Sequence, residues 1–123
     1  MKRILLIDDE KDFRDGMKVL LEIYGYEVRI AENGSAGYCL RAETNFDLII
    51  TDILMPEMDG LELILKVRSV SPNAKIIAIS GGGKGLNATD YLKLSVSLGA
   101  DRALRKPFQM LELLDTIKEL LPN

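Results

Sequence analysis

The chain opens with an apolar run that three acids follow at once, since residues 3–10 are RILLIDDE. Two later segments have the same form: residues 47–52 are DLIITD and residues 75–80 are KIIAIS. Short runs that are apolar at nearly every position and end in a polar residue are typical of strands covered on both faces, which occur in parallel sheets. The predicted strands are residues 3–7, 47–51 and 75–79, with weaker candidates at 27–31 and 101–105.

Helical spacing separates these runs. Apolar residues recur at intervals of three or four from Phe13 to Tyr24, which places them on one face of a helix, and Gly25 follows as a stop signal. The other predicted helices are residues 35–43, 61–70, 88–98 and 109–121, the third of these with Asn87 as its N-cap. Strand and helix alternate five times, which predicts an α/β protein with a parallel sheet, folded as one domain over residues 1–123.

The composition restricts the chemistry of the chain. Its 123 residues contain no histidine, which excludes Ser-His and Cys-His nucleophile pairs, the usual zinc ligand sets and a phosphohistidine on this chain. The single cysteine, Cys39, cannot form an internal disulfide and favours a reducing, cytoplasmic setting. A net charge of −3 argues against direct binding to nucleic acid. No apolar run approaches the ~18 residues of a membrane span, so no membrane association is expected.

Acids stand at the ends of two predicted strands. Asp8, Asp9 and Glu10 follow the first strand, and Asp52 follows the third. Ligands of open parallel sheets collect beyond the carboxyl ends of the strands, so we expect these carboxylates to lie close together. Their mutual repulsion must be relieved by raised pKa values or by a bound cation. Oxygen donors without histidine or thiolate favour Mg²⁺, with Mn²⁺ as the alternative.

Two further strand ends carry groups that suit a phosphoryl group. Ser80 follows the fourth strand and Lys106 the fifth. A hydroxyl donor and a positive point charge match the equatorial oxygens of a phosphoryl group in transfer. Each polar residue taken singly has a plain structural explanation as a helix cap, a turn, a loop or a solvated strand end. Their occurrence together, one set per strand end, favours a site that holds a phosphoryl group.

Four motifs occur in order along the chain: residues 7–10 (IDDE), residues 52–60 (DILMPEMDG), Ser80 and residues 106–108 (KPF). Together they resemble the receiver domain of two-component response regulators, and the resemblance spans nearly the whole chain. It implies a flavodoxin-like, doubly wound sheet of five parallel strands in the order 2-1-3-4-5 with five helices. It also implies that Asp52 accepts a phosphoryl group from a histidine kinase or a histidine phosphotransfer protein.

The same resemblance implies the roles of the residues around Asp52. Asp8, Asp9, Asp52 and the main-chain carbonyl of Leu54 would hold Mg²⁺, Asp8 through a water molecule. The ionised Asp52 would attack a phosphoramidate phosphorus while Lys106 and the metal neutralise the oxygens. The peptide bond that follows Lys106 is expected to be cis. The product would switch a surface on the fourth helix, fifth strand and fifth helix toward a protein target or an effector domain, without turnover of a small molecule.

The chain departs from the usual receiver pattern in places that bear on output. Ala103 stands where many receivers have Phe or Tyr, so the aromatic switch that is coupled to Ser80 is missing. We expect ordering of the glycine-rich residues 81–85 to take its place. Leu54 and Gly82 offer no polar side chain that would orient an attacking water, which predicts slow loss of the phosphoryl group.

Other functions are weighed against this one. A receiver-shaped interaction domain that takes no phosphate is the main alternative, and the complete set of acids, Ser80 and Lys106 disfavours it. A flavin carrier of the same fold would need a phosphate loop where residues 8–10 are acidic. An aspartyl phosphohydrolase would need a second acid where Leu54 stands. The sequence is compatible both with a stand-alone regulator and with one part of a longer protein.

Overall fold

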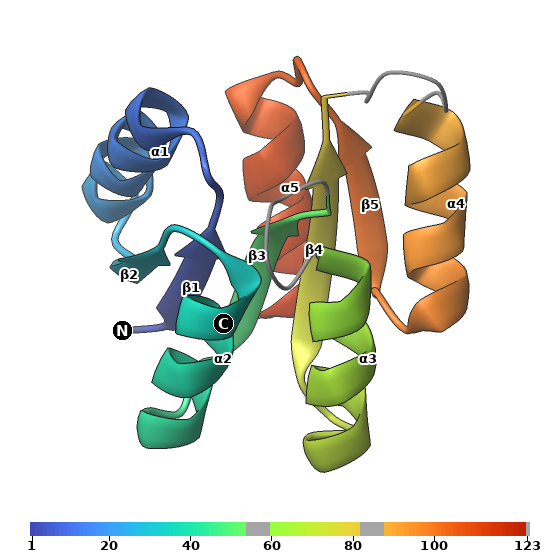
Figure 1. Cartoon of the computed structure of the whole chain (residues 1–123). Helices are drawn as coiled ribbons and strands as arrows, with labels where there is room; N and C mark the ends of the chain where they lie inside the picture. Colours follow the sequence, from blue (N-terminus) through green and yellow to red (C-terminus); the bar gives the residue numbers. More distant parts are fainter. Residues whose placement is uncertain (54–59, 82–87, 123) are drawn as a thin grey trace.

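A computed structural model describes residues 1–53, 60–81 and 88–122, without the side chains of 88–92. In these ranges one parallel sheet has the order β2-β1-β3-β4-β5, which confirms the predicted flavodoxin-like fold (Figure 1). The strands are β1 (Arg3–Ile7), β2 (Glu27–Ala31), β3 (Leu48–Asp52), β4 (Lys75–Ser80) and β5 (Arg102–Arg105). The helices are α1 (Lys11–Ile23), α2 (Gly34–Glu43), α3 (Gly60–Val70), α4 (Ala88–Leu98) and α5 (Met110–Leu120).

Helices cover both faces of the sheet. Ile4 and Leu6 of β1 pack into the cluster formed with α1 and α5, whereas Leu5 and Ile7 pack into the cluster formed with α2, α3 and the end of α4. All four side chains are fully buried. Burial of each contributes about 1.5–3 kcal/mol to folding. The two covered faces explain why the strand residues are apolar at successive positions instead of alternating.

The strand ends differ from the predicted ones by about one residue. β3 begins at Leu48, and the preceding Asp47 is tied to Arg3 by two hydrogen bonds, from its own N to the Arg3 carbonyl (2.9 Å) and from Arg3 N to its Oδ2 (2.8 Å). β3 and β4 extend to Asp52 and Ser80, which stay in register with the neighbouring strands. Both residues therefore have their main chains fixed by the sheet.

The helix boundaries agree closely with the spacing of apolar residues. Gly25 has φ +96° and lies just after Tyr24, the C-cap of α1, which confirms its predicted role as a stop signal. Asn33 caps α2 by accepting a hydrogen bond from Ala36 N at 2.8 Å. The predicted cap Asn87 lies outside the described residues.

Arg68 ties α3 to the turns that precede β4 and β5. Its Nη1 donates to the carbonyl oxygens of Pro72 and Ala74, each at 2.7 Å. Its Nη2 donates to the carbonyl of Gly99 and, at 3.1 Å, to the carboxylate of Asp101. A planar guanidinium group bonds several acceptors at once, which an ammonium group does less well.

Replacement of Arg68 by Met should lower the free energy of unfolding by about 2–4 kcal/mol, because three carbonyl groups and Asp101 lose a charged donor. Urea denaturation measures this loss. Arg102→Met is the matched control: its exposed pair with Glu119, at 3.5 Å, and its exposed hydrogen bond to the Asp101 carbonyl, at 2.8 Å, together contribute at most about 1 kcal/mol. Equal losses in the two variants would contradict the role given to Arg68.

Candidate functional site

The carboxyl ends of four strands bring the predicted site residues to one edge of the sheet (Figure 1). Asp8 directly follows β1, Asp52 ends β3, Ser80 ends β4 and Lys106 directly follows β5. β3 lies between β1 and β4, so Asp52 stands between the other strand ends. Ser80 is fully buried, and its carbonyl oxygen accepts a hydrogen bond from Lys106 N at 2.9 Å. The main chain of Lys106 is thus fixed to the end of β4.

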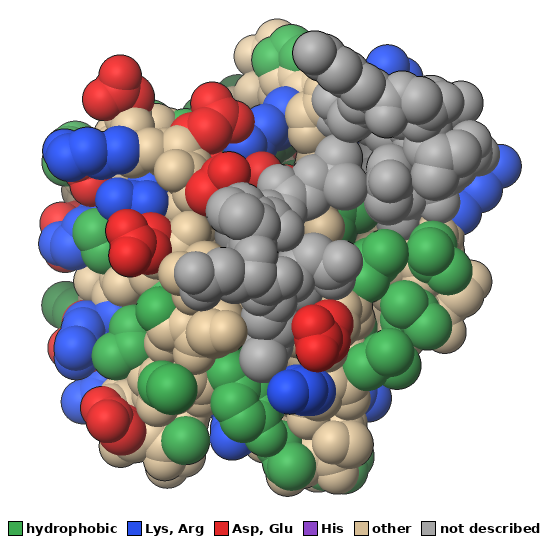
Figure 2. All heavy atoms as spheres, viewed as in Figure 1, with side chains coloured by type: hydrophobic (Ala, Val, Ile, Leu, Met, Phe, Trp, Pro, Cys, Tyr) green, Lys and Arg blue, Asp and Glu red, His purple; other side chains and the backbone are tan. Residues whose placement is uncertain are grey.

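Three carboxylates share the ammonium group of Lys106. Its Nζ lies 2.8 Å from Asp8 Oδ2, 3.3 Å from Glu10 Oε1 and 3.5 Å from Asp52 Oδ2. The exposed fraction of the side chain is 0% for Asp8, 8% for Asp52 and 13% for Lys106, but 67% for Glu10. Acidic side chains gather around this edge in the space-filling view (Figure 2). The site therefore consists of two buried carboxylates, one partly buried cation and a third carboxylate at the solvent edge.

The turn after β1 holds Asp8 in place through its main chain and its side chain. Asp8 N donates to the carbonyl of Ala31 (3.2 Å), and its own carbonyl accepts from Arg14 Nη1 (2.9 Å). Its Oδ1 accepts from Glu10 N at 2.9 Å, which leaves Oδ2 for Lys106. Glu10 is the N-cap of α1, and its own side chain makes no cap hydrogen bond. Helix capping therefore does not explain the glutamate at this position.

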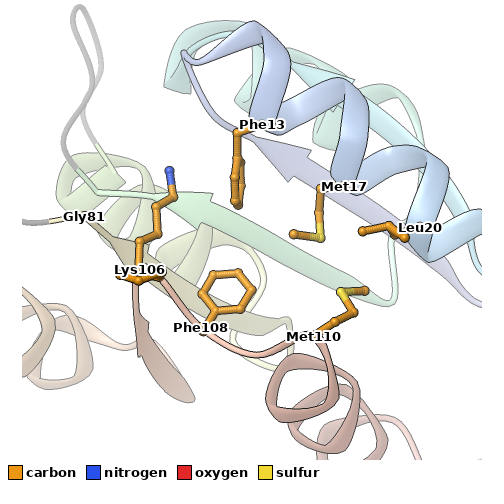
Figure 3. A pocket seen from close by; sticks show the side chains of 8 residues that line it. Phe13, Met17, Leu20, Gly81, Lys106, Phe108 and Met110 are labelled. Atoms are coloured by element: carbon orange, nitrogen blue, oxygen red, sulfur yellow. The ribbon is translucent and has the colours of Figure 1, made fainter.

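An apolar pocket of about 470 Å³ lies beside Lys106, between α1 and the start of α5 (Figure 3). The Lys106 Nζ stands 4.0 Å from the centroid of the Phe13 ring, a distance at which a cation is attracted by the ring face. The rings of Phe13 and Phe108 meet edge to face at 6.2 Å, and Met17 and Met110 extend the lining. The ammonium group thus lies between an acidic cluster and an aromatic wall.

The pKa of Lys106 is raised above 10.5. Burial acts to lower it, but the hydrogen bond and charge of Asp8, then the charge of Asp52 and the hydrogen bond of Glu10, together outweigh burial. Lys106 is therefore a stable cation throughout the physiological pH range. The peptide bond between Lys106 and Pro107 is cis, as expected.

The donor set of the cluster fits a hard divalent cation. Asp8, Glu10 and Asp52 each offer an oxygen, and these oxygens lie within 4.8 Å of one another. Opposite ligands of an octahedral Mg²⁺ ion are about 4.2 Å apart, so a small adjustment places the oxygens around one ion. Asp9, a predicted ligand, is exposed and is not one of these three. Leu54 lies outside the described residues, and its carbonyl stays a predicted ligand.

α3 begins against the main chain at the end of β3. Gly60 N donates to the carbonyl of Ile53 at 3.3 Å. A Cβ atom on Gly60 would overlap the carbonyl oxygen of Asp52 and the Cα of Ile53. Because these are main-chain atoms of the strand end, they cannot yield without moving Asp52.

Comparisons with known proteins agree with this geometry. The family model for the response regulator receiver domain matches residues 4–118. The chain belongs to this family. Its acidic cluster fits the phosphorylation site of receiver domains, and no observation supports the alternative of a phosphate-independent interaction domain.

The receiver domain is similar to several named proteins and solved structures. It is 35% identical to the response regulator receiver protein CpdR of Brucella abortus over 98% of both chains. It is 31% identical to a CpxR homologue of Haemophilus influenzae, of which it covers 51%. The structure of TrrA from Thermotoga maritima in complex with Mg²⁺-BeF is similar with a TM-score of 0.86 and 37% identity, over 98% of this chain and 99% of that one. A receiver domain from Clostridium thermocellum has a TM-score of 0.91 and 31% identity, over 99% and 95%.

Two residues of the site have no role in the motif-based prediction. The sequence predicts Glu10 at the end of the first strand. It does not predict the contact with Lys106, because that contact depends on how the turn after Asp8 folds. Phe13 was expected only on the buried face of α1. The sequence signal that brings them together is the third consecutive acid, Glu10, followed three residues later by the aromatic Phe13. This spacing places both residues at the start of α1.

Gly60→Ala should destabilise the receiver domain by about 1–3 kcal/mol, since the added methyl group forces the main chain at Asp52 to shift. Urea denaturation and the amide NMR shifts of residues 50–53 measure the effect. Gly16→Ala is the matched control: nothing lies within 4 Å of its Cβ position, and helix propensity predicts a gain of about 0.5–1 kcal/mol. The same sign of change in both variants would contradict the steric argument.

The stabilising contribution of Lys106 should depend on pH. Its pKa is higher in the folded than in the unfolded chain, so the contribution is fully present below about pH 10.4 and is lost as the pH rises through the raised value. Urea denaturation of the wild type and of Lys106→Met, with EDTA from about pH 8 to about pH 11, measures the difference. Lys75→Met, at an exposed position, is the control. A Lys106 difference that does not change with pH would refute this.

Proposed function

We propose that Asp52 accepts a phosphoryl group from a histidine kinase or a histidine phosphotransfer protein, and that the domain then switches a protein-interaction surface. The observation that carries this proposal is the arrangement around one ammonium group. The Asp52 carboxylate lies 3.5 Å from Lys106 Nζ and belongs to the oxygen cluster that it forms with Asp8 and Glu10. A nucleophile, a fixed cation and a set of metal-binding oxygens thus occupy the same edge of the sheet.

The chain's own residues supply the acceptor chemistry. A carboxylate oxygen of Asp52 attacks the phosphorus of the partner's phosphohistidine: an O–P bond forms, the P–N bond breaks, and its electron pair stays on the imidazole nitrogen. The Lys106 ammonium neutralises an oxygen of the group that arrives on Asp52. The hydroxyl group of Ser80, at the end of the adjacent strand, donates a hydrogen bond to another.

Receiver domains bind Mg²⁺ at an acidic cluster; here Asp8 and Asp52 would hold it, the exposed Glu10 would add negative charge beside it, and Mn²⁺ is the alternative. When bound, the metal supplies positive charge to the phosphoryl oxygens. Asp9 and the carbonyl of Leu54 remain proposed as further ligands on the sequence motif. The structure of the TrrA relative is a complex with Mg²⁺-BeF, which supports the proposal that this chain binds Mg²⁺.

The proposed activity is that of a signalling acceptor, with its own phosphorylation and dephosphorylation as the only reactions. An aspartyl phosphohydrolase would need a second catalytic acid two residues after its nucleophile, and Leu54 stands at that position after Asp52. Slow loss of the phosphoryl group remains a prediction from Leu54 and Gly82, which lie outside the described residues.

The buried position of Asp52 restricts how a donor reaches it. We propose that the partner's histidine enters at the solvent edge where Glu10 is exposed, with the adjoining surface of α1 and the apolar pocket beside Phe13 as the contact area. Output is proposed through α4, β5 and α5. Ala103 of β5 is half-buried and provides no aromatic ring for a rotamer switch. Ordering of residues 81–85 is the proposed substitute; apart from Gly81, these lie outside the described residues.

The organisation and location of the protein are also proposed. Residues 1–123 form one receiver domain that acts on a protein target or on an effector domain, and relatives of both lengths exist, since the chain covers 98% of CpdR but 51% of the CpxR homologue. In the described part of the chain, no helix has the length and apolar character needed to cross a membrane. A cytoplasmic location is proposed because Cys39 is free and exposed. We propose that this domain does not bind nucleic acid directly, because its net charge is −3.

Incubation with a small phosphoryl donor and Mg²⁺ should add one phosphoryl group, as measured by intact-protein mass spectrometry. Asp52→Asn and a chelator should each abolish the gain, because one removes the nucleophile and the other the metal. Asp12→Asn removes an exposed carboxylate outside the cluster and should leave it unchanged. If the wild type gains no mass with any donor or metal, the phosphate-independent interaction domain becomes the better function.

A further inference from the structure

Glu10 differs from the other acids of the cluster in its exposure. Asp8 and Asp52 are buried, whereas the Glu10 side chain is 67% exposed. An exposed glutamate with three rotatable bonds ordinarily contributes little, because solvent screens its charge. Glu10 is nevertheless closer to Lys106 Nζ than Asp52 is, at 3.3 Å against 3.5 Å. Its reach toward this ammonium group therefore needs an explanation.

The surroundings of the ammonium group are asymmetric. Among the described residues, its two nearest carboxylates, those of Asp8 and Glu10, lie in the turn after β1, and the aromatic ring at 4.0 Å, Phe13, lies in the first turn of α1. Asp52, on β3, is the most distant of the three carboxylates. Lys106 is thus held mainly by residues 8–13, and Glu10 is the member of that group with freedom to move.

We propose that Glu10 is a positioning residue for the phosphoryl-accepting reaction. Its carboxylate holds the Lys106 ammonium on the α1 side of the site before phosphorylation, and its charge strengthens the binding of the divalent cation. The inference rests on the proposed function of Asp52. The role of Glu10 has two parts. The contact with Lys106 requires the full length of the glutamate side chain, whereas attraction of the divalent cation requires only a negative charge near the cluster.

Three variants separate reach from charge. Glu10→Gln removes the charge, Glu10→Asp keeps the charge but is one methylene shorter, and Asp12→Asn removes a neighbouring exposed charge that is not part of the cluster. The exposure of Glu10 makes all three variants compatible with folding, which thermal unfolding checks. The side-chain ammonium signal of Lys106 in ¹⁵N-correlated NMR spectra, recorded with EDTA, reports the contact. Amide shifts during a Mg²⁺ titration report the affinity for the metal.

Glu10→Gln should shift the Lys106 ammonium signal and weaken Mg²⁺ binding by about 3- to 10-fold, the effect of one unit charge near a partly buried site. Glu10→Asp should shift the Lys106 signal in the same way but keep the Mg²⁺ dissociation constant within about twofold, since the charge remains. Asp12→Asn should change neither measurement.

An unchanged Lys106 signal in Glu10→Gln would overturn the positioning role. Equal weakening of Mg²⁺ binding in Asp12→Asn and Glu10→Gln would overturn the specific role in cation binding, because general surface charge would then explain it. Phosphoryl gain by the wild type is measured on the same preparations. If the wild type gains a phosphoryl group but Glu10→Gln leaves both NMR measurements unchanged, only this inference fails. If the wild type gains none, the proposed function fails instead, whatever the Lys106 signal shows.

Discussion

The attraction between one ammonium group and three carboxylates is the interaction on which the site depends. Like charges this close, two of them buried, repel one another strongly unless a cation lies among them. Lys106 supplies that cation from β5, two strands away from Asp52, and the hydrogen bond from its main-chain N to the Ser80 carbonyl aligns it across the end of β4. The charge balance of the site therefore depends on the strand order, because β1, β3, β4 and β5 lie side by side and their carboxyl ends share one edge of the sheet.

Burial on both faces of the sheet explains why the chemistry lies at the strand ends. The side chains within β1, β3 and β4 are committed to two apolar clusters, so charged groups have low-energy positions only where the strands stop. Asp52 and Ser80 are the last residues that the sheet still holds by its register. Gly60 adds a second constraint by packing directly against the main chain of Asp52. The main chain of Asp52, the proposed nucleophile, is thus fixed, which would favour in-line attack on a group that arrives from solvent.

The apolar runs predicted the fold well because strands covered on both faces leave a strong pattern. The boundaries moved by one residue at β3 and β4 because main-chain pairing continues to Asp52 and Ser80, which polarity alone does not indicate. Among the site residues, Asp8, Asp52 and Lys106 were predictable, since each stands at a strand end and neighbouring parallel strands end together. The sequence does not predict which of the three consecutive acids face the site, namely Asp8, Asp9 and Glu10. Their orientation depends on the turn in which the Asp8 side chain accepts a hydrogen bond from Glu10 N. The spacing of Phe13 indicates that it lies on the buried face of α1. It does not indicate the contacts with Lys106 and Phe108, which are distant in the sequence.

The same geometry restricts how a change at Asp52 reaches the rest of the domain. A phosphoryl group adds about −1.5 to −2 charge at an edge that is already acidic, so the surrounding groups must rearrange. Asp8 is held by hydrogen bonds to its own turn, to α1 and to β2, and it is the least able to move. Lys106 and Ser80 are joined through their main chains, so a shift in either is transmitted to the ends of β4 and β5. Ala103 lies in β5 opposite Ala78 of β4, and two small side chains there offer no bulky group that would flip. Displacement of the β4 and β5 ends is therefore the route that we propose for the presentation of a changed surface.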